Sequence, residues 1–190
     1  FVFEKGNTTG RIQFTAPSKK INGEPLTGNL TYYVVANNDT VKKAVAMAGT
    51  KVDDEITVTG GDTKFLVTIA NAAGSSPKVR YTAWVGYDIP ADIERVKFSY
   101  DGTTAVVTWP SVTQGKHGGY VGEVIYDVKR MPDGAQVQTN VTGNSLSVPF
   151  TTTELKKYSF AITPKAGNRQ GNEVASNGIV IGKAIVPPFK

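Results

Sequence analysis

Apolar and polar residues alternate along most of the chain, in runs of about five to nine residues. This period of two is typical of β-strands, whose successive side chains point to opposite faces of a sheet. Leu30 to Ala36, Thr104 to Trp109 and Tyr158 to Thr163 are clear examples, and turn-forming residues such as Asp101-Gly102 separate the runs. No stretch keeps the roughly 3.6-residue period of a helix. The pattern therefore predicts an all-β chain.

An internal repeat divides the chain into two units. Phe14 and Trp109 hold matching places, 18 and 17 residues before a tyrosine. We expect one domain at residues 1–90 and a second at residues 91–190, because about 90 residues and about seven strands are typical of a β-sandwich. A short junction, Gly86 to Asp92, would connect them. The segments that match are Gly28–Val34 with Gly122–Val128, and Phe65–Gly74 with Tyr158–Gly167.

The aromatic residues of the second unit follow a recognisable spacing. Trp109 closes its second strand, a Tyr-x-Val pattern at Tyr126 and Val128 marks its third strand, and its sixth strand runs from Tyr158 to an Ala-Gly pair at Gly167. This arrangement resembles a fibronectin type III domain. The resemblance implies two immunoglobulin-like, seven-stranded β-sandwiches in tandem, held together by their cores rather than by disulfides. In that family the tryptophan and the aromatic residue of the sixth strand pack between the two sheets.

The first unit fits the same pattern with Phe14 in place of the tryptophan and Phe65 in place of the sixth-strand tyrosine. Matched positions on alternating strands predict one core in each unit. The two predicted clusters are Trp109, Tyr126, Val128 and Tyr158, and Phe14, Tyr32, Val34 and Phe65.

Composition narrows the range of functions. The chain has 190 residues, no cysteine, one histidine and a formal net charge of +5, which splits into +2 up to Pro90 and +3 after it. The basic residues do not cluster into a stripe with interleaved aromatics, so we expect no nucleic-acid binding. No apolar run approaches the roughly eighteen residues of a membrane-spanning helix, so we expect no direct membrane insertion.

The residues that could carry chemistry are few. His117 lies in a glycine-rich loop and is expected to be an exposed loop histidine, because no positioned serine accompanies it. Asp53-Asp54-Glu55 could offer oxygen ligands to calcium, but calcium loops place acidic residues at alternate positions with a turn glycine. We read this run as a solvated strand. We therefore expect no catalytic residues, no metal site and no cofactor.

Strand alternation also predicts an exposed strip in the first unit. If Tyr32 and Val34 face the core, Tyr33 points outward, and Gly86, which matches Gly182, places Trp84 outward on the last strand. Leu66 would lie between them on the sixth strand. Such a strip could bind a partner protein or a glycan, because aromatic side chains supply apolar area at little entropic cost. In the alternative interpretation, Trp84 covers the sheet or packs on the second unit.

We thus expect a non-catalytic spacer and protein–protein or adhesion module of a secreted or cell-surface protein. Its partners would be neighbouring domains of the same polypeptide, and a host or surface protein or a glycan. The alternative is a carbohydrate-binding or accessory module of a secreted hydrolase. Trp84-Val-Gly-Tyr-Asp-Ile-Pro90 and the tail from Ala184 to Lys190 resemble segments of outer-surface proteins of Bacteroidetes, and Asp39-Thr40-Val41 resembles their O-glycosylation motif.

Overall fold

The computed structural model describes residues 1–183, and every regular element in that range is a β-strand. The chain divides into two compact units, unit 1 from Phe1 to Tyr87 and unit 2 from Asp88 onward. The prediction of an all-β chain built from two β-sandwiches is confirmed. The tail, residues 184–190, lies outside the described residues.

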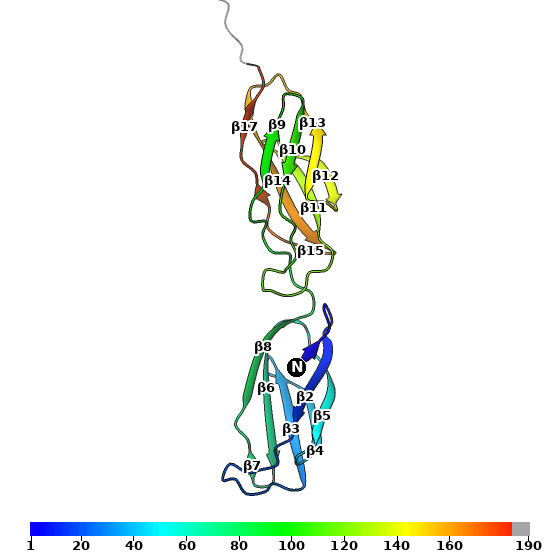
Figure 1. Ribbon diagram of the computed structural model, residues 1–190, viewed down its shortest axis with the longest axis vertical. Helices are drawn as coiled ribbons and strands as arrows, with labels where there is room; N and C mark the ends of the chain where they lie inside the picture. The colour runs from blue at the N-terminus through cyan, green and yellow to red at the C-terminus, as the bar shows by residue number, and fades with distance from the viewer. Residues whose placement is uncertain (184–190) are drawn as a thin grey trace, which may run out of the picture. The chain divides into compact units, whose positions relative to one another are not determined.

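Unit 1 forms two antiparallel sheets (Figure 1). One has the order β1-β2-β5, and the other has the order β4-β3-β6, with β7 and β8 both paired to the far edge of β6. Because β7 and β8 are two segments of one last strand, the unit has the seven strands that the sequence predicts. Its elements are β1 (Val2–Phe3), β2 (Thr9–Thr15), β3 (Asn29–Ala36), β4 (Asp39–Met47), β5 (Lys51–Thr57), β6 (Gly61–Asn71), β7 (Gly74–Ser75) and β8 (Val79–Val85).

Unit 2 repeats this topology. One sheet has the order β9-β10-β13, and the other has the order β12-β11-β14, with β15, β16 and β17 following one another along the far edge of β14. Its elements are β9 (Lys97–Tyr100), β10 (Thr104–Thr108), β11 (Ile125–Met131), β12 (Ala135–Val141), β13 (Ser145–Pro149), β14 (Lys156–Ala166), β15 (Arg169–Gln170), β16 (Val174–Ala175) and β17 (Ile179–Ile181).

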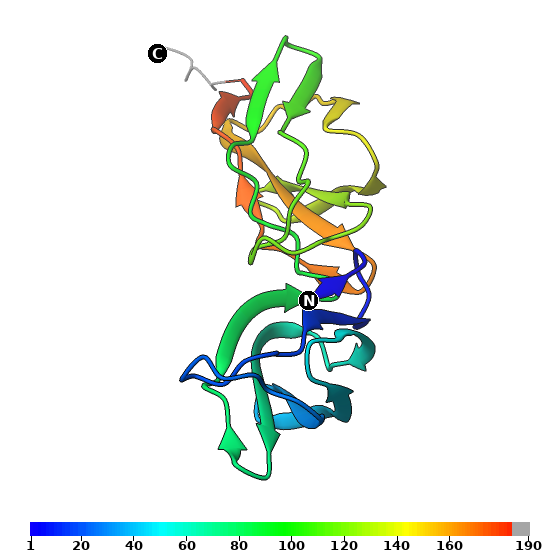
Figure 2. The same ribbon diagram turned by 60° about the horizontal axis from the view of Figure 1, so that its bottom comes forward.

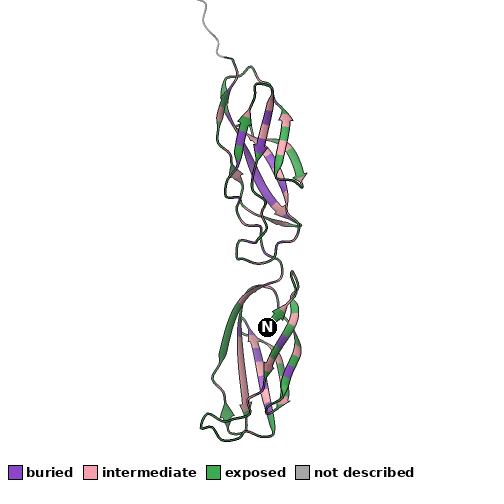
Figure 3. Ribbon diagram, in the orientation of Figure 1, coloured by how far each residue is buried: buried purple, intermediate pink, exposed green. Residues whose placement is uncertain are grey.

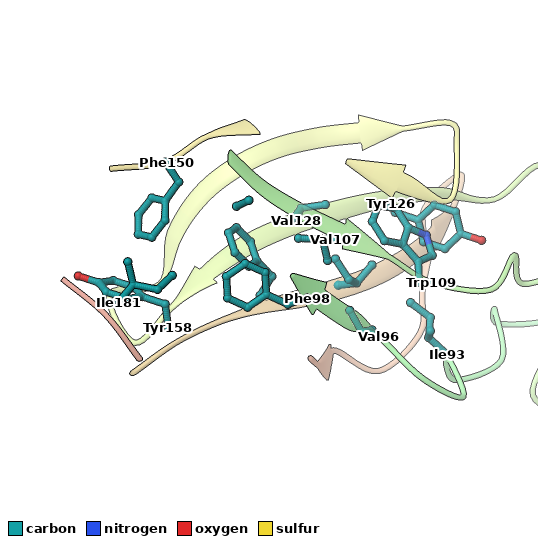
Figure 4. Packing of buried hydrophobic residues seen from close by; sticks show 13 residues of the cluster. Ile93, Val96, Phe98, Val107, Trp109, Tyr126, Val128, Phe150, Tyr158 and Ile181 are labelled. Atoms are coloured by element: carbon teal, nitrogen blue, oxygen red, sulfur yellow. The ribbon is translucent and has the colours of Figure 1, made fainter. Parts of the chain in front are cut away.

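Each unit has its own core between its two sheets. Buried and less buried residues alternate along the central strands, as a filled sandwich requires (Figure 3). In unit 2, Trp109 packs edge to face with Tyr126 at a ring separation of 5.4 Å, and Tyr158 lies near Phe150 at the opposite end of the cluster (Figure 4). In unit 1, Phe14 packs edge to face with Tyr32 at 5.3 Å.

Both predicted core clusters are confirmed. All four residues predicted for unit 2 are buried in one cluster. In unit 1 three of the four are buried in one cluster, and Phe14 packs against it while half-buried. The phenylalanine fills less space than the indole of Trp109, and part of its ring stays accessible.

The strand register corrects the sequence alignment at one point. In β3, Ala36 lies opposite Phe65, and in β11 the matching Arg130 lies opposite Phe160. Phe65 therefore corresponds to Phe160 and not to Tyr158. A shift of two residues keeps every side chain on the same face of a strand, so the hydrophobic pattern alone cannot detect it.

The clearest apolar runs of the sequence do not include β1, β4, β7, β12 or β15. Strands β4 and β12 are edge strands with an exposed outer face, and their apolar residues are interrupted by lysine, glutamine and threonine. The apolar run from Glu173 to Ile181, which alternation predicts as one strand, forms two, β16 and β17. The break occurs because Asn177 leaves the ladder and bonds the backbone of Phe98 through its amide.

Candidate functional site

The predicted strip lies on the outer face of the larger sheet in unit 1. Tyr33 is opposite Thr68 on β6, so Leu66, two residues along β6, is its diagonal neighbour. Trp84 is opposite Asp62 on β6, four residues from Leu66. The polar pair of Lys64 and Thr82 lies between the level of Leu66 and the level of Trp84, on the same face of the sheet. The structure therefore brings Tyr33 and Leu66 together and leaves Trp84 apart from them.

All three side chains are half-buried. The Nζ atom of Lys43 lies 5.5 Å from the centre of the Tyr33 ring, a cation–π arrangement. The indole Nε1 of Trp84 donates a hydrogen bond to the carbonyl of Tyr87 at 3.3 Å. In unit 2 the register places Asp127, Ala161 and Val180 at the matching positions, so the repeat does not carry a second copy of the strip.

A polar hollow of about 570 Å³ lies beside Leu66, between β6, β8 and the turn that joins β3 to β4. Asn37 shapes its wall: its side-chain amide donates to the carbonyl of Asp62 at 2.9 Å and accepts from the backbone N–H of Lys64 at 2.8 Å. The strip contributes only Leu66 to this hollow. Its polar lining residues are Asn37, Asn38, Asp62, Lys64, Arg80 and Thr82.

Unit 2 contains a buried carboxylate that the sequence analysis did not identify. Asp88 has no exposed surface, and its oxygens accept hydrogen bonds from the backbone N–H groups of His117 at 2.8 Å, Gly119 at 3.0 Å and Ile89 at 2.7 Å. The ring Nδ1 of His117 lies 2.8 Å from Oδ1 of the same carboxyl group. Asp88 therefore organises the loop around His117.

Burial by itself would raise the pKa of Asp88, but the hydrogen bonds from His117, Gly119 and Ile89 outweigh it and hold the pKa below its ordinary value. The carboxylate is thus ionised in the folded unit. The His117 side chain is 45% exposed, as predicted, but its ring is fixed by a partner from the junction. Gly115 leaves room for this carboxyl group, because a Cβ atom at that position would overlap it.

The junction segment from Asp88 to Ala91 pairs along its length with the loop before β11. The backbone N–H of Asp88 donates to Tyr120 at 2.7 Å, and Ala91 donates to Gln114 at 3.1 Å. A further bond of 2.9 Å joins the N–H of Lys116 to the carbonyl of Ile89. These bonds attach the junction segment to unit 2 as an extended segment outside its two sheets.

Arg169, on β15, also binds the backbone of the junction segment and of the loop before β11. Its guanidinium donates to the carbonyl of Asp88 at 2.5 Å and to the carbonyl of Val121 at 3.2 Å. One side chain therefore joins the junction segment, the loop before β11 and the hairpin after β14.

The acidic run on β5 serves packing within unit 1. Asp53 pairs with Arg11 at 2.6 Å, and Asp54 accepts a hydrogen bond from Tyr32 and lies 3.6 Å from the Nζ atom of Lys42. Burial, followed by the bond to Asp54, raises the pKa of Tyr32. Within residues 1–183 no group of three or more histidine, cysteine, aspartate or glutamate side chains is placed to hold a metal ion.

No family model matches the chain, and no curated protein matches it by sequence. Solved structures are similar to it at low identity. The FN1–FN3 domains of chicken CNTN1 have 14% identity and a TM-score of 0.41 over 94% of this chain and 64% of that one. The central fibronectin-III array of RIM-binding protein has 19% identity and a TM-score of 0.36 over 95% and 61%.

A two-domain fibronectin type III segment from chicken tenascin has 13% identity and a TM-score of 0.38, with 95% of this chain and 96% of that chain covered. This chain spans about three fifths of the length of the CNTN1 and RIM-binding protein structures.

The assignment of the fold rests on the strand order and register of the two units. Residues 1–183 contain no helix able to cross a membrane.

Proposed function

We propose that the chain is a non-catalytic tandem β-sandwich module of a secreted or cell-surface protein, which acts as a spacer and as a protein–protein or adhesion module. The observation that supports the spacer role is the shortness of the junction. Only Gly86 and Tyr87 lie between the end of β8 at Val85 and Asp88, where the backbone pairing with unit 2 begins. A connection of so few residues limits the freedom of one domain relative to the next.

In this proposal the domains are residues 1–90 and residues 91–190, and residues 88–90 pack on the second domain. Each domain carries a filled core of its own, which is the condition for independent folding. The partners are neighbouring domains of the same polypeptide.

Spin labels test the spacer role directly. The chain has no cysteine, so Lys51→Cys and Ser145→Cys, both exposed, would carry the only two labels. We expect a single narrow distance distribution between them. Asp88→Ala should broaden the distribution, because it removes the acceptor of the junction bonds, whereas Asp39→Ala, an exposed aspartate of β4, should leave it unchanged. A broad distribution for the chain with Asp88 intact would contradict the proposal.

A carbohydrate-binding or accessory role in a secreted hydrolase is the second candidate. The hollow beside Leu66 supports it, because Asn38, Asp62 and Arg80 place amide, carboxylate and guanidinium groups next to the strip that contains Tyr33. Sugar recognition uses this combination of polar hydrogen-bonding groups and an aromatic face.

A further inference from the structure

In unit 2, the junction segment fills the space between the loop before β11 and the hairpin after β14. Pro90 is buried, and Ile93 belongs to the core cluster. The fit is close: a Cβ atom on Gly171 would lie 2.7 Å from the carbonyl oxygen of Pro90. The end of the sandwich is therefore closed by an extended segment that is not part of either sheet.

The same place in unit 1 is open. Lys165 lies opposite Gln170, and the matching Ala70 lies opposite Ser75, so the β6–β7 turn corresponds to the β14–β15 turn. The loop before β3 lies beside β7 in both ribbon views (Figures 1 and 2). Between them is a groove of about 620 Å³. Its apolar lining residues include Pro17, Ile21, Leu26, Leu30, Ile69 and Pro77.

The lining of this groove leaves apolar surface accessible. Ile21 is 94% exposed, and Ile69, an inward-facing residue of β6, is only half-buried. Large aliphatic side chains with this exposure at one site mark a binding surface more often than isolated ones do. The volume suits a few residues of an extended peptide rather than a folded domain.

Charge indicates the nature of the occupant. Lys19 and Lys20 line the groove, and no aspartate or glutamate does. Lys20 pairs with Glu24 at 2.8 Å just outside the lining, so Lys19 supplies the net positive charge. The segment that closes unit 2 carries Asp88 and Asp92, and its carboxylate at position 88 meets the ring of His117. Lys19 therefore gives the groove a net positive charge at the place that an acidic segment occupies in the repeat.

We propose that the groove of unit 1 binds an extended, acidic, proline-containing peptide segment with the chemistry of Asp88–Ile93. A second copy of the chain does not supply it, because residues 88–91 of each copy are paired within unit 2. The proposal goes beyond the spacer role and does not depend on it.

A synthetic peptide with the sequence of residues 86–94 tests the proposal on the full chain. We expect saturable binding by isothermal titration, with backbone amide shifts concentrated at Leu26 and Ile69. Ala73→Trp would fill the groove and should weaken binding at least about tenfold. Ala72→Trp is the matched control, because Ala72 is exposed and does not line the groove, and it should leave the affinity unchanged.

Two charge-reversal variants test the role of the groove's positive charge. Lys19→Glu should weaken peptide binding several-fold, and Lys78→Glu, which is exposed outside the groove, should not. The proposal is overturned if the unsubstituted chain does not bind the peptide, or if Ala72→Trp and Ala73→Trp weaken binding equally. Amide shifts confined to the loop around His117 would also overturn it, since the peptide would then be displacing the segment of unit 2.

Discussion

The ring nitrogen Nδ1 of His117 lies 2.8 Å from Oδ1 of Asp88, a carboxyl group with no exposed surface. Because the carboxylate is ionised and can only accept, Nδ1 carries the hydrogen of this bond. The two residues lie 29 positions apart in sequence, one in the junction and the other in a glycine-rich loop. Their pairing makes the junction a structural part of unit 2.

Replacing Asp88 should destabilise unit 2. Asp88→Ala leaves the N–H groups of His117 and Gly119 without their acceptor in a buried site, and we expect a loss of about 2–3 kcal/mol. Urea unfolding followed by tryptophan fluorescence measures it. Each unit carries one tryptophan, so a Trp84→Phe background reports unit 2 through Trp109 alone. A loss below about 0.5 kcal/mol, the range of ordinary surface changes, would show that the carboxylate is not structural.

The same carboxylate predicts a dependence of stability on pH. The pKa of Asp88 is lower in the folded unit than its ordinary value of 3.8. The stabilisation that it provides is therefore complete well above pH 3.8, begins to fall as the pH approaches that value, and is lost as the pH falls through the folded-state pKa. Asp88→Asn should be less stable at neutral pH and should lose less stability between about pH 5 and pH 3.

Unfolding free energies of both proteins at several pH values in that range provide the measurement. Part of the acid sensitivity should remain in Asp88→Asn, because Lys165 and the N–H of Asn140 also outweigh burial to lower the pKa of Asp127. Parallel curves for the two proteins would contradict the assigned role of Asp88.

The sequence predicted the sandwiches well because burial and strand alternation are local signals. Tyr126 and Val128, with a polar residue between them, indicate one strand face without reference to any other part of the chain. The hydrogen bond from Val112 to the hydroxyl of Tyr126 could not be predicted, because it depends on where a loop passes. Asp88 was missed for the same reason: one acidic residue in a junction resembles any solvated aspartate until the loop that surrounds it is placed.

The predicted strip shows the same limit. Alternation assigned Tyr33, Leu66 and Trp84 to one face of one sheet, and the register agrees. Position along the strands is set by pairing, which alternation does not report. Trp84 is level with Asp62, four positions along β6 from Leu66, as a consequence of that pairing.

The junction should stabilise the second domain in isolation. A fragment of residues 88–190 retains the pairing of Asp88 and Ala91 with the following loop, whereas a fragment of residues 91–190 lacks the Asp88 carboxylate. We expect both fragments to fold, and the longer one to be more stable by about 2–3 kcal/mol. In the shorter fragment the N–H groups of His117 and Gly119 lose the carboxylate that accepts their hydrogen bonds. Circular dichroism with urea titration of each fragment gives the comparison. If residues 88–190 were unfolded alone, the two units would be one cooperative domain.

The core of unit 2 should depend strongly on its tryptophan. Trp109 is 3% exposed and packs on Tyr126, so Trp109→Ala should cost about 3–5 kcal/mol, as for other buried aromatics. Unit 1 should remain folded, because its core is a separate cluster. Fluorescence of Trp84, the remaining tryptophan, follows unit 1 during unfolding, and amide exchange follows unit 2. A loss under about 1 kcal/mol would show that Trp109 does not support the core.

The strip of unit 1 offers the most direct test of partner binding. Tyr33→Ala and Trp84→Ala together should abolish binding on a glycan array or to immobilised surface proteins and lower the melting temperature by no more than about 4 °C, which corresponds to about 1 kcal/mol for a unit of this size. Val180→Ala, at the position of unit 2 that matches Trp84, is the control and should bind normally.

The single variants sharpen this prediction. Because Trp84 lies four residues of β6 away from Leu66, the effects of Tyr33→Ala and Trp84→Ala on binding free energy should add, as they do for sites without shared contacts. Leu66→Ala, in contrast, should couple to Tyr33→Ala, its diagonal neighbour. Affinities of the three single and two double variants give both coupling energies. Unchanged binding by the double variant of Tyr33 and Trp84 would remove the strip from consideration as a binding surface.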